Sequence, residues 1–308
     1  MKTAYLFAGQ GAQYLGMGKE LYEEYPLVRE IFEQADATLG YSLTQIIFND
    51  EEKLNETKYT QPAILTINYA IQKLLESQGI KADAAIGLSL GEYSALLAAS
   101  VFDFPTALKL VAKRGQFMSE AAPKGTGKMV AVMNADVTLI EEICQKASSK
   151  GIVTPANYNT PAQIVIGGEV EAVDYAVELL KENGVKRLIE LNVSGPFHTA
   201  LLESASVRLA QELANVEMNK LSMPVISNTT AKLFKQEEIK ELLIKQVKSP
   251  VRFYESIDSL KELGIDTFIE IGPGKVLSGF MKKIDKTLQT TRVEDLATLN
   301  STLEILGE

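Results

Sequence analysis

A sharp turn between an apolar strand-like run and a helix-like run constrains this chain more than any other feature. Residues 84–88 form the apolar run, and Gly87-Leu88-Ser89-Leu90-Gly91 matches the pattern G-x-S-x-G. This pattern requires a strand before it and a helix after it, because its glycines permit the turn that exposes a serine above a sheet. Residues 92–100 have the character of that helix. The turn therefore predicts an α/β fold in which the Ser89 hydroxyl is exposed.

Strand-like and helix-like runs also alternate along the rest of the chain, as is typical of α/β proteins. The strands expected from short apolar runs cover residues 3–8, 84–88, 223–227 and 266–271, and a helix with clear apolar spacing covers residues 64–78. No fixed-period repeat and no low-complexity tract interrupts the alternation.

The middle of the chain has an order of its own, which is strand, helix, strand, strand, helix, strand. We expect its strands at residues 129–134, 152–157, 163–166 and 186–193, and its helices at residues 136–149 and 169–183. This order is the ferredoxin-like pattern. Segments rich in Pro and Gly flank it at Pro123–Gly127 and Ser194–Pro196. The chain therefore predicts a discontinuous large α/β domain, residues 1–124 and 195–308, around a small inserted domain of residues 125–194.

Composition excludes several classes of protein. A chain of 308 residues with 46% hydrophobic residues can bury a core without disulfides or a structural metal. Its single cysteine, Cys144, and single histidine, His198, exclude a disulfide framework and a Cys- or His-rich metal site, so no metal is expected. The net charge of −9 argues against binding of nucleic acid, which needs a basic surface.

The sequence also shows no targeting or membrane-spanning segment. No apolar run approaches the roughly 20 residues of a membrane-spanning helix, and the first residues, Met1–Tyr5, lack the apolar core of a signal peptide. We therefore expect a soluble, cytoplasmic protein without a membrane partner.

A serine nucleophile needs a base, and His198 is the only imidazole in the chain. It lies in a turn just beyond the strand expected at residues 186–193. A Gly-rich turn with an incidental serine, and an ordinary structural histidine, are the alternatives to catalysis. The pairing of the two favours catalysis, and the start of the following helix makes the Leu90 N–H a natural oxyanion donor. Spacing identifies no acid that would orient His198.

Gly9-Gln10-Gly11 also follows a strand-like run and precedes a helix-like one. Such an early loop commonly provides the second oxyanion N–H. A phosphate-binding loop is the alternative, but Gly9, Gly11 and Gly16 do not match G-x-G-x-x-G, and no GK[ST] follows.

Arg114 interrupts the apolar stripe of a helix that starts near Asp103 and Pro105. Either its head reaches solvent, or it presents a guanidinium to a carboxylate in a pocket. Cys144 falls at helical spacing with Ile140 and Ile143, which favours a buried core thiol over a second nucleophile.

Taken in order, these motifs resemble the malonyl-CoA:acyl carrier protein transacylases of bacterial fatty acid synthesis. The resemblance runs along nearly the whole chain, through residues 7–11, 59–63, 87–92, 113–115, 156–159, 195–198 and 270–277. It implies an α/β-hydrolase-like large domain with a ferredoxin-like insert. It also implies malonyl-CoA as the donor substrate, no permanently bound cofactor, and acyl carrier protein as partner.

The resemblance further implies a role for each matching residue. Ser89 would carry the malonyl ester, and His198 would act as base and then acid, oriented by the backbone carbonyl of Gln246. The N–H groups of Gln10 and Leu90 would bind the oxyanion. Arg114 would bind the free malonyl carboxylate, and Gln61, Asn157 and Phe197 would line the acyl site.

Two positions near the site bear on specificity. The family often has His where this chain has Leu88, which puts any polar contact there in doubt. Phe197 fits the malonyl type rather than the methylmalonyl type, in which a small residue precedes the histidine. Branched donors should therefore fit less well.

Three other functions stay open on the residues alone. These are a serine thioesterase or hydrolase, a discrete polyketide acyltransferase, and a non-catalytic acyl-CoA or carrier-binding protein.

We expect the protein to be a monomer. Because carrier proteins are usually acidic, docking of one would need a local basic patch on its surface. The candidate groups are Lys275, Lys282, Lys283 and Lys286, and separately Lys186 and Arg187.

Overall fold

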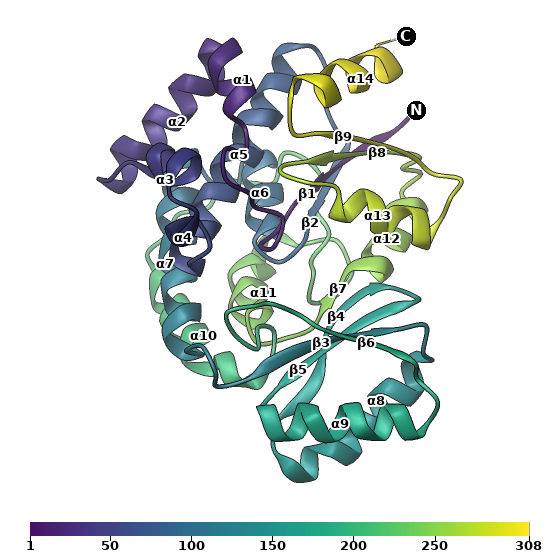
Figure 1. Ribbon diagram of the computed structural model, residues 1–308. Helices are drawn as coiled ribbons and strands as arrows, with labels where there is room; N and C mark the ends of the chain where they lie inside the picture. The colour runs from purple at the N-terminus through teal and green to yellow at the C-terminus, as the bar shows by residue number, and fades with distance from the viewer. Residues whose placement is uncertain (308) are drawn as a thin grey trace.

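Two β-sheets organise residues 1–307, the part of the chain described by a computed structural model (Figure 1). The first sheet has the strand order β2-β1-β8-β9, and all its pairings are parallel. Its strands are β1 (Thr3–Phe7), β2 (Ala84–Gly87), β8 (Thr267–Ile271) and β9 (Gln289–Val293). Every residue of β1, β2 and β8 is buried, as in a parallel sheet covered on both faces.

Register brings the ends of the central strands to one edge. Phe7, the last residue of β1, pairs with Gly87 of β2 and with Ile271 of β8. The three loops that follow these strands therefore start side by side. Ligands of parallel α/β sheets bind at this edge, beyond the carboxyl ends of the strands.

Helices cover both faces of this sheet (Figure 1). α6 (Gly91–Ala98) begins directly after the turn at Ser89, and α13 (Val276–Ile284) begins after β8. α7 (Phe104–Ala121) packs along α5 (Thr57–Ser77), and the Asp103 side chain caps its first turn, as the sequence predicts. The other helices here are α1 (Lys19–Glu24), α2 (Pro26–Leu39), α3 (Leu43–Asn49), α4 (Glu51–Leu54), α10 (Glu203–Ala214), α11 (Ile239–Gln246), α12 (Phe253–Glu262) and α14 (Leu296–Leu306).

The second sheet is mixed and has the order β6-β3-β5-β4-β7. It contains β3 (Lys128–Met133), β4 (Val153–Thr160), β5 (Gln163–Gly168), β6 (Arg187–Glu190) and β7 (Val251–Arg252). α8 (Val137–Ala147) and α9 (Val170–Glu182) pack side by side against it (Figure 1). The four strands and two helices expected between residues 129 and 193 are thus confirmed. β7 adds a parallel edge from a distant part of the chain.

Three details differ from expectation. Residues 223–227 form single bridges, Ala85 with Val225 and Ile226 with Leu233, instead of a strand. Pro224 has no N–H to donate to a ladder, which explains the interruption. β9 was not expected, because its sequence Gln-Thr-Thr-Arg-Val is too polar to resemble a buried strand. α5 begins at Thr57, so Pro62 lies inside it.

No helix within residues 1–307 has the length and apolarity to span a membrane.

Candidate active site

The turn at Ser89 is as tight as its glycines suggest. A Cβ atom on Gly87 would lie 1.8 Å from the carbonyl carbon of Gly91, and one on Gly91 would lie 2.2 Å from the oxygen of Phe7. Ser89 itself has a φ of 54°, a left-handed conformation that non-glycine residues rarely adopt. The side chain of Asn228 stabilises this backbone, since its Oδ1 accepts from Ser89 N at 2.8 Å and its Nδ2 donates to Gly87 O at 2.6 Å.

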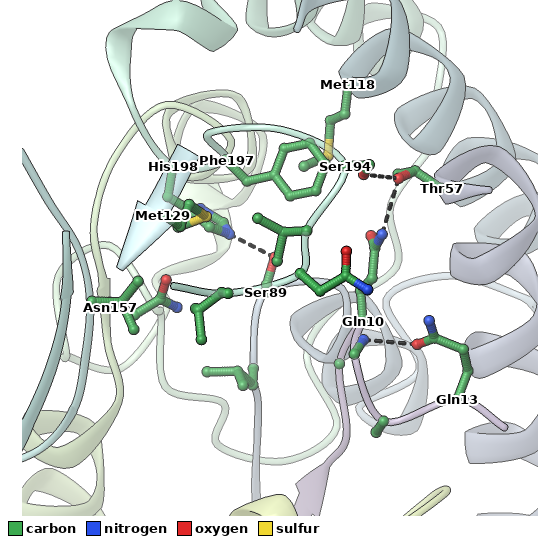
Figure 2. Close-up of a pocket in the computed structure, with 18 of the residues that line it drawn as sticks. Gln10, Gln13, Thr57, Ser89, Met118, Met129, Asn157, Ser194, Phe197 and His198 are labelled. Carbon is green, nitrogen blue, oxygen red and sulfur yellow. Dashed lines mark hydrogen bonds between the residues drawn. The ribbon is translucent and has the colours of Figure 1, made fainter. Parts of the chain in front are cut away.

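Ser89 and His198 meet as a hydrogen-bonded pair (Figure 2). Ser89 Oγ lies 2.7 Å from His198 Nε2, and His198 Nδ1 lies 2.7 Å from the backbone oxygen of Gln246. Because a carbonyl oxygen can only accept, we assign the proton to Nδ1, which leaves Nε2 to accept from the serine. This is the arrangement of a nucleophile, a base and an orienting group, with a neutral carbonyl in the third place.

The imidazole is neutral at physiological pH. His198 is only 3% exposed, and its burial lowers its pKa to about 4, helped by the positive charge of Arg114 and opposed by the bond to the Gln246 carbonyl. A neutral imidazole can take the serine proton at once.

Arg114 lies beside this pair, within the core. It comes from α7, is 1% exposed, and its guanidinium stands over the Tyr93 ring, with 5.2 Å between Cζ and the ring centroid. Nη1 donates to Gln61 Oε1 at 2.7 Å, while Nη2 donates to Gln246 Oε1 at 2.7 Å and to Ser89 Oγ at 3.2 Å. All three partners are uncharged, so the guanidinium has no carboxylate within hydrogen-bond reach among residues 1–307 and can attract one from a ligand.

The loop after β1 approaches the elbow closely. A Cβ on Gly9 would lie 2.3 Å from the oxygen of Leu88, so only glycine fits there. The side chain of Gln10 donates to Thr57 Oγ1 at 2.9 Å and accepts from Gln61 Nε2 at 3.3 Å. Within the described chain, the backbone N–H groups of Gln10 and Leu90 donate to no acceptor, and both belong to turns next to Ser89.

A cleft of about 1110 Å³ opens onto Ser89 and His198. One wall carries the loop after β1, the turn at Ser89 and the start of α13. The opposite wall consists of residues of the mixed sheet, among them Met129 of β3, Asn157 of β4 and Val165 of β5. Figure 2 shows Phe197 and Met118 together on one side of Ser89 and Asn157 on the other side. In residues 1–307, no three His, Cys, Asp or Glu side chains gather as metal ligands would.

Comparison with known proteins agrees with this geometry. The model of the acyl transferase domain family matches residues 4–301. The malonyl CoA-acyl carrier protein transacylase of Bacillus subtilis (strain 168) is 46% identical over 310 residues, covering 100% of this chain and 98% of that protein. The enzyme of the same name from Escherichia coli (strain K12) is 40% identical and covers 98% and 99%. The chain belongs to the malonyl CoA-acyl carrier protein transacylase family of acyl transferases.

Solved structures of the family superpose on the whole enzyme. The MCAT of Streptococcus pneumoniae has a TM-score of 0.98 at 60% identity, covering 99% of this chain and 100% of that one. A malonyl-transacylase solved in complex with its type II PKS acyl-carrier protein has a TM-score of 0.96 at 40% identity, with coverage of 99% and 100%.

The structure gathers the residues singled out in the sequence into one site. Ser89, His198, the Gln246 carbonyl, Arg114 and Gln61 form one hydrogen-bonded group. Gln10, Asn157 and Phe197 line the cleft with Ser89, and Leu88 lines it too. Leu90 is buried at the start of α6. Cys144 lies outside the site, on the buried face of α8, and burial raises the pKa of its thiol to about 12.

Two residues of the site escaped the sequence analysis. Asn228 follows the apolar run 223–227, and Glu92 is the second residue of α6. Glu92 is completely buried, and this burial raises its pKa to about 8 despite the N–H of Asn228, the charge of Arg114 and the Gln246 amide. The signal was present in the sequence, since an acid directly after the elbow glycine begins a helix that is otherwise apolar. Its partners, however, lie more than 130 residues away in the chain.

Proposed function

We propose that the protein transfers the malonyl group from malonyl-CoA to the phosphopantetheine thiol of acyl carrier protein, through a malonyl ester on Ser89, for fatty acid biosynthesis. The observation that carries this proposal is the position of Arg114 Nη2, which lies 3.2 Å from Ser89 Oγ. A buried cation next to the nucleophile suits an acyl group that ends in a carboxylate. Membership of the transacylase family supports the same donor and acceptor.

Acylation begins when Ser89 Oγ attacks the thioester carbonyl and its proton passes to His198 Nε2. The carbonyl oxygen becomes an oxyanion, for which the free N–H groups of Gln10 and Leu90 are the donors we assign. Collapse of the tetrahedral intermediate breaks the carbon–sulfur bond, and His198 returns the proton to the coenzyme A thiolate. The Gln246 carbonyl keeps the Nδ1–H of His198 in place throughout.

The second half reverses these steps with a new thiol. The pantetheine thiol gives its proton to His198 and attacks the ester carbonyl. The carbon–oxygen bond to Ser89 then breaks, and the serine regains the proton. Kinetics of this kind are ping-pong, because coenzyme A leaves before carrier protein reacts.

Arg114 and the cleft walls set the choice of donor in this scheme. The guanidinium would exchange its contact with Ser89 Oγ for a bidentate contact to the malonyl carboxylate. Gln61, Asn157 and Phe197 would surround the rest of the acyl group. Phe197 is bulky and 8% exposed, which should exclude a branched donor.

The basic group on α13 and at its two ends is the better candidate for contact with an acidic carrier protein. Lys275, Lys282, Lys283 and Lys286 are exposed, and no described residue forms an ion pair with them. α13 also places Val276, Leu277 and Phe280 on the rim of the cleft. Lys186 and Arg187 lie at the start of β6 and do not line the cleft. We therefore assign carrier docking to α13.

The architecture suits the same assignment. We infer an α/β-hydrolase-like large domain, residues 1–124 and 195–308, and a ferredoxin-like insert, residues 125–194. The order β6-β3-β5-β4 with α8 and α9 on one face supports the insert, and the parallel sheet with its Ser89 elbow supports the large domain. We further expect a cytoplasmic monomer that holds no permanent cofactor.

Intact-protein mass spectrometry tests the proposal. The protein and its Ser89→Ala variant are each mixed with malonyl-CoA, and carrier protein is then added. We expect a malonyl adduct on the unaltered protein alone, which carrier protein removes. Discharge by water at the same rate would instead indicate a hydrolase or thioesterase. An unaltered protein that neither gains mass nor releases coenzyme A would leave only a binding role. Comparing fatty acid and polyketide carrier proteins as acceptors separates the two biosynthetic roles.

A further inference from the structure

Glu92 carries a completely buried carboxyl group with no part in the reaction steps above. It lies in the first turn of α6, three residues after the nucleophile, and both of its oxygens accept hydrogen bonds. Oε2 accepts from the backbone N of Asn228 at 2.5 Å, and Oε1 accepts from Gln246 Nε2 at 3.2 Å. Burying a carboxyl group is costly unless such donors satisfy its oxygens. Both donors belong to residues that position the Ser89–His198 pair. Asn228 bonds the backbone at Ser89, and the Gln246 carbonyl accepts from His198.

The side chain of Gln246 has one orientation in which all of its contacts are satisfied. Its Nε2 donates to Glu92 Oε1 and, at 2.8 Å, to the backbone oxygen of Ser89. Its Oε1 accepts from Arg114 Nη2 at 2.7 Å. The backbone oxygen of Ser89 can only accept and the guanidinium of Arg114 can only donate. The NH₂ end of the amide therefore faces Ser89 O and Glu92, and the oxygen end faces Arg114.

The contacts of Arg114 depend on that orientation. A guanidinium only donates, so it needs an acceptor at Gln246. If the amide were reversed, its NH₂ group would face the NH₂ group of Arg114 and the contact would be lost. The remaining contact of Nη2, to Ser89 Oγ, is the longer one at 3.2 Å.

We propose that Glu92 is a positioning residue that, through the Gln246 amide, holds the Arg114 guanidinium where it selects a carboxylate-bearing acyl donor. The proposal rests on the proposed function and extends it to a residue that never touches the substrate. Its chemical core is the direction of hydrogen bonding from Arg114 through Gln246 to Glu92.

Glu92→Gln is the most direct test, since it keeps the size of the side chain but adds an NH₂ group opposite two donors. Either Asn228 N or Gln246 Nε2 then faces another donor, and reversal of the Gln246 amide relieves the second conflict. We expect kcat/KM for malonyl-CoA to fall about tenfold to a hundredfold, the effect typical of a lost hydrogen bond to a charged group. For acetyl-CoA, which has no free carboxylate, we expect a fall of less than about threefold. Equal losses for both donors would overturn the proposal.

A double-mutant cycle separates action through Arg114 from general damage. Added to Arg114→Ala, Glu92→Gln should leave the ratio of malonyl to acetyl transfer unchanged within about twofold. A ratio that falls as far as it does in the single variant would contradict the proposal. Glu270→Gln is the matched control. Glu270 is equally buried but accepts from Leu277 N, Ser278 N and Ser278 Oγ of α13, so its loss should lower the melting temperature and leave the ratio alone.

Two further measurements cover the remaining outcomes. If Glu92→Gln does not fold, Gln246→Met removes the amide yet keeps the backbone carbonyl at His198, and the ratio should fall to a similar extent. An unchanged ratio would overturn the proposal. A crystal structure of Glu92→Gln decides independently of activity, and the proposal fails if Gln246 still contacts both Ser89 O and Arg114 Nη2. Failure of the proposed function is distinct, because the unaltered protein would then form no malonyl adduct.

Discussion

The two walls of the cleft hold their side chains in different ways. On the wall that carries Ser89 and His198, these two residues and the buried Arg114 beside them each have at least two hydrogen bonds that restrain them. On the wall built by the mixed sheet, Met129 and Val165 are apolar and Asn159 bonds only its neighbour Gln163, at 3.1 Å. The Asn157 side chain there makes no hydrogen bond to another described residue. One wall is a preorganised polar network, and the other is a shaped surface.

This difference follows from what each wall has to do. A nucleophile, a base and a charge partner lower a barrier only when they are already in position, and a misplacement of about 1 Å can cost about a hundredfold in rate. A wall that only excludes water and fills space tolerates small changes. Substitutions on the two walls should therefore differ by orders of magnitude.

His198→Asn should have the largest effect on the polar wall. His198 has a φ of 60°, and asparagine tolerates this conformation well, so the change removes the imidazole with little backbone strain. Loss of one member of a nucleophile–base unit costs about 10⁴–10⁶ in rate. We expect a fall of that size in the single-turnover rate of coenzyme A release, with a melting temperature close to that of the unaltered protein. A variant that kept a tenth of the rate would show that another group acts as base.

Arg114→Ala comes next and concerns the charge partner. A charge-assisted bidentate contact in a buried site should give a loss of about 10²–10³ in kcat/KM for malonyl-CoA. Acetyl-CoA should lose much less, since it presents no second carboxylate. Steady-state kinetics with both donors measures the ratio. If it does not change, Arg114 supports only the structure, and the proposed selection of malonyl fails.

The polar wall could be predicted only where its residues stand in local motifs. The elbow was predictable, because close approaches force glycine at Gly87 and Gly91 and a strand and helix flank them. Asp103 and Pro105 likewise indicated the start of the helix that carries Arg114. The pairing of Ser89 with His198 needed only the scarcity of histidine in the chain.

Long-range contacts set the limit of that prediction. Which atom orients His198 was not derivable from spacing, because a backbone carbonyl has no residue signature, and only the family resemblance pointed to Gln246. Asn228 and Glu92 meet across 136 positions of the chain. Similarly, β7 and β9 contain too few apolar residues to be recognised and depend on strands far away in the sequence. Tertiary pairing, rather than local preference, makes these contacts.

The pH dependence of acylation gives a smaller but distinctive effect on the polar wall. The pKa of His198 is lowered to about 4 from 6.5, by burial first and by Arg114 second. An ordinary imidazole would be about nine-tenths protonated at pH 5.5, whereas His198 stays neutral, so the burst rate should change less than about twofold between pH 7 and pH 5.5. Keeping below pH 7 avoids titration of Glu92, whose pKa is about 8.

The same shift has a consequence for stability. The unfolded chain takes up the His198 proton before the folded one, so the free energy of unfolding should decrease as the pH falls from 6.5 toward about 4.

The burst rate of acylation gives the contrary outcome. A tenfold fall in that rate by pH 5.5, without loss of folded protein, would show that His198 titrates normally.

Asn157→Ala should have the smallest effect and tests the shaped wall. Asn157 is half-buried at a bulge of β4, and its side chain has no protein partner to leave unsatisfied. Its removal should therefore cost less than about tenfold in kcat/KM for malonyl-CoA, the range of one neutral hydrogen bond to a ligand. Val165→Ala on the neighbouring strand is the matched control for lost volume. A loss of a hundredfold or more at Asn157 alone would mean that this wall contributes to the reacting group, and the contrast between the two walls would not hold.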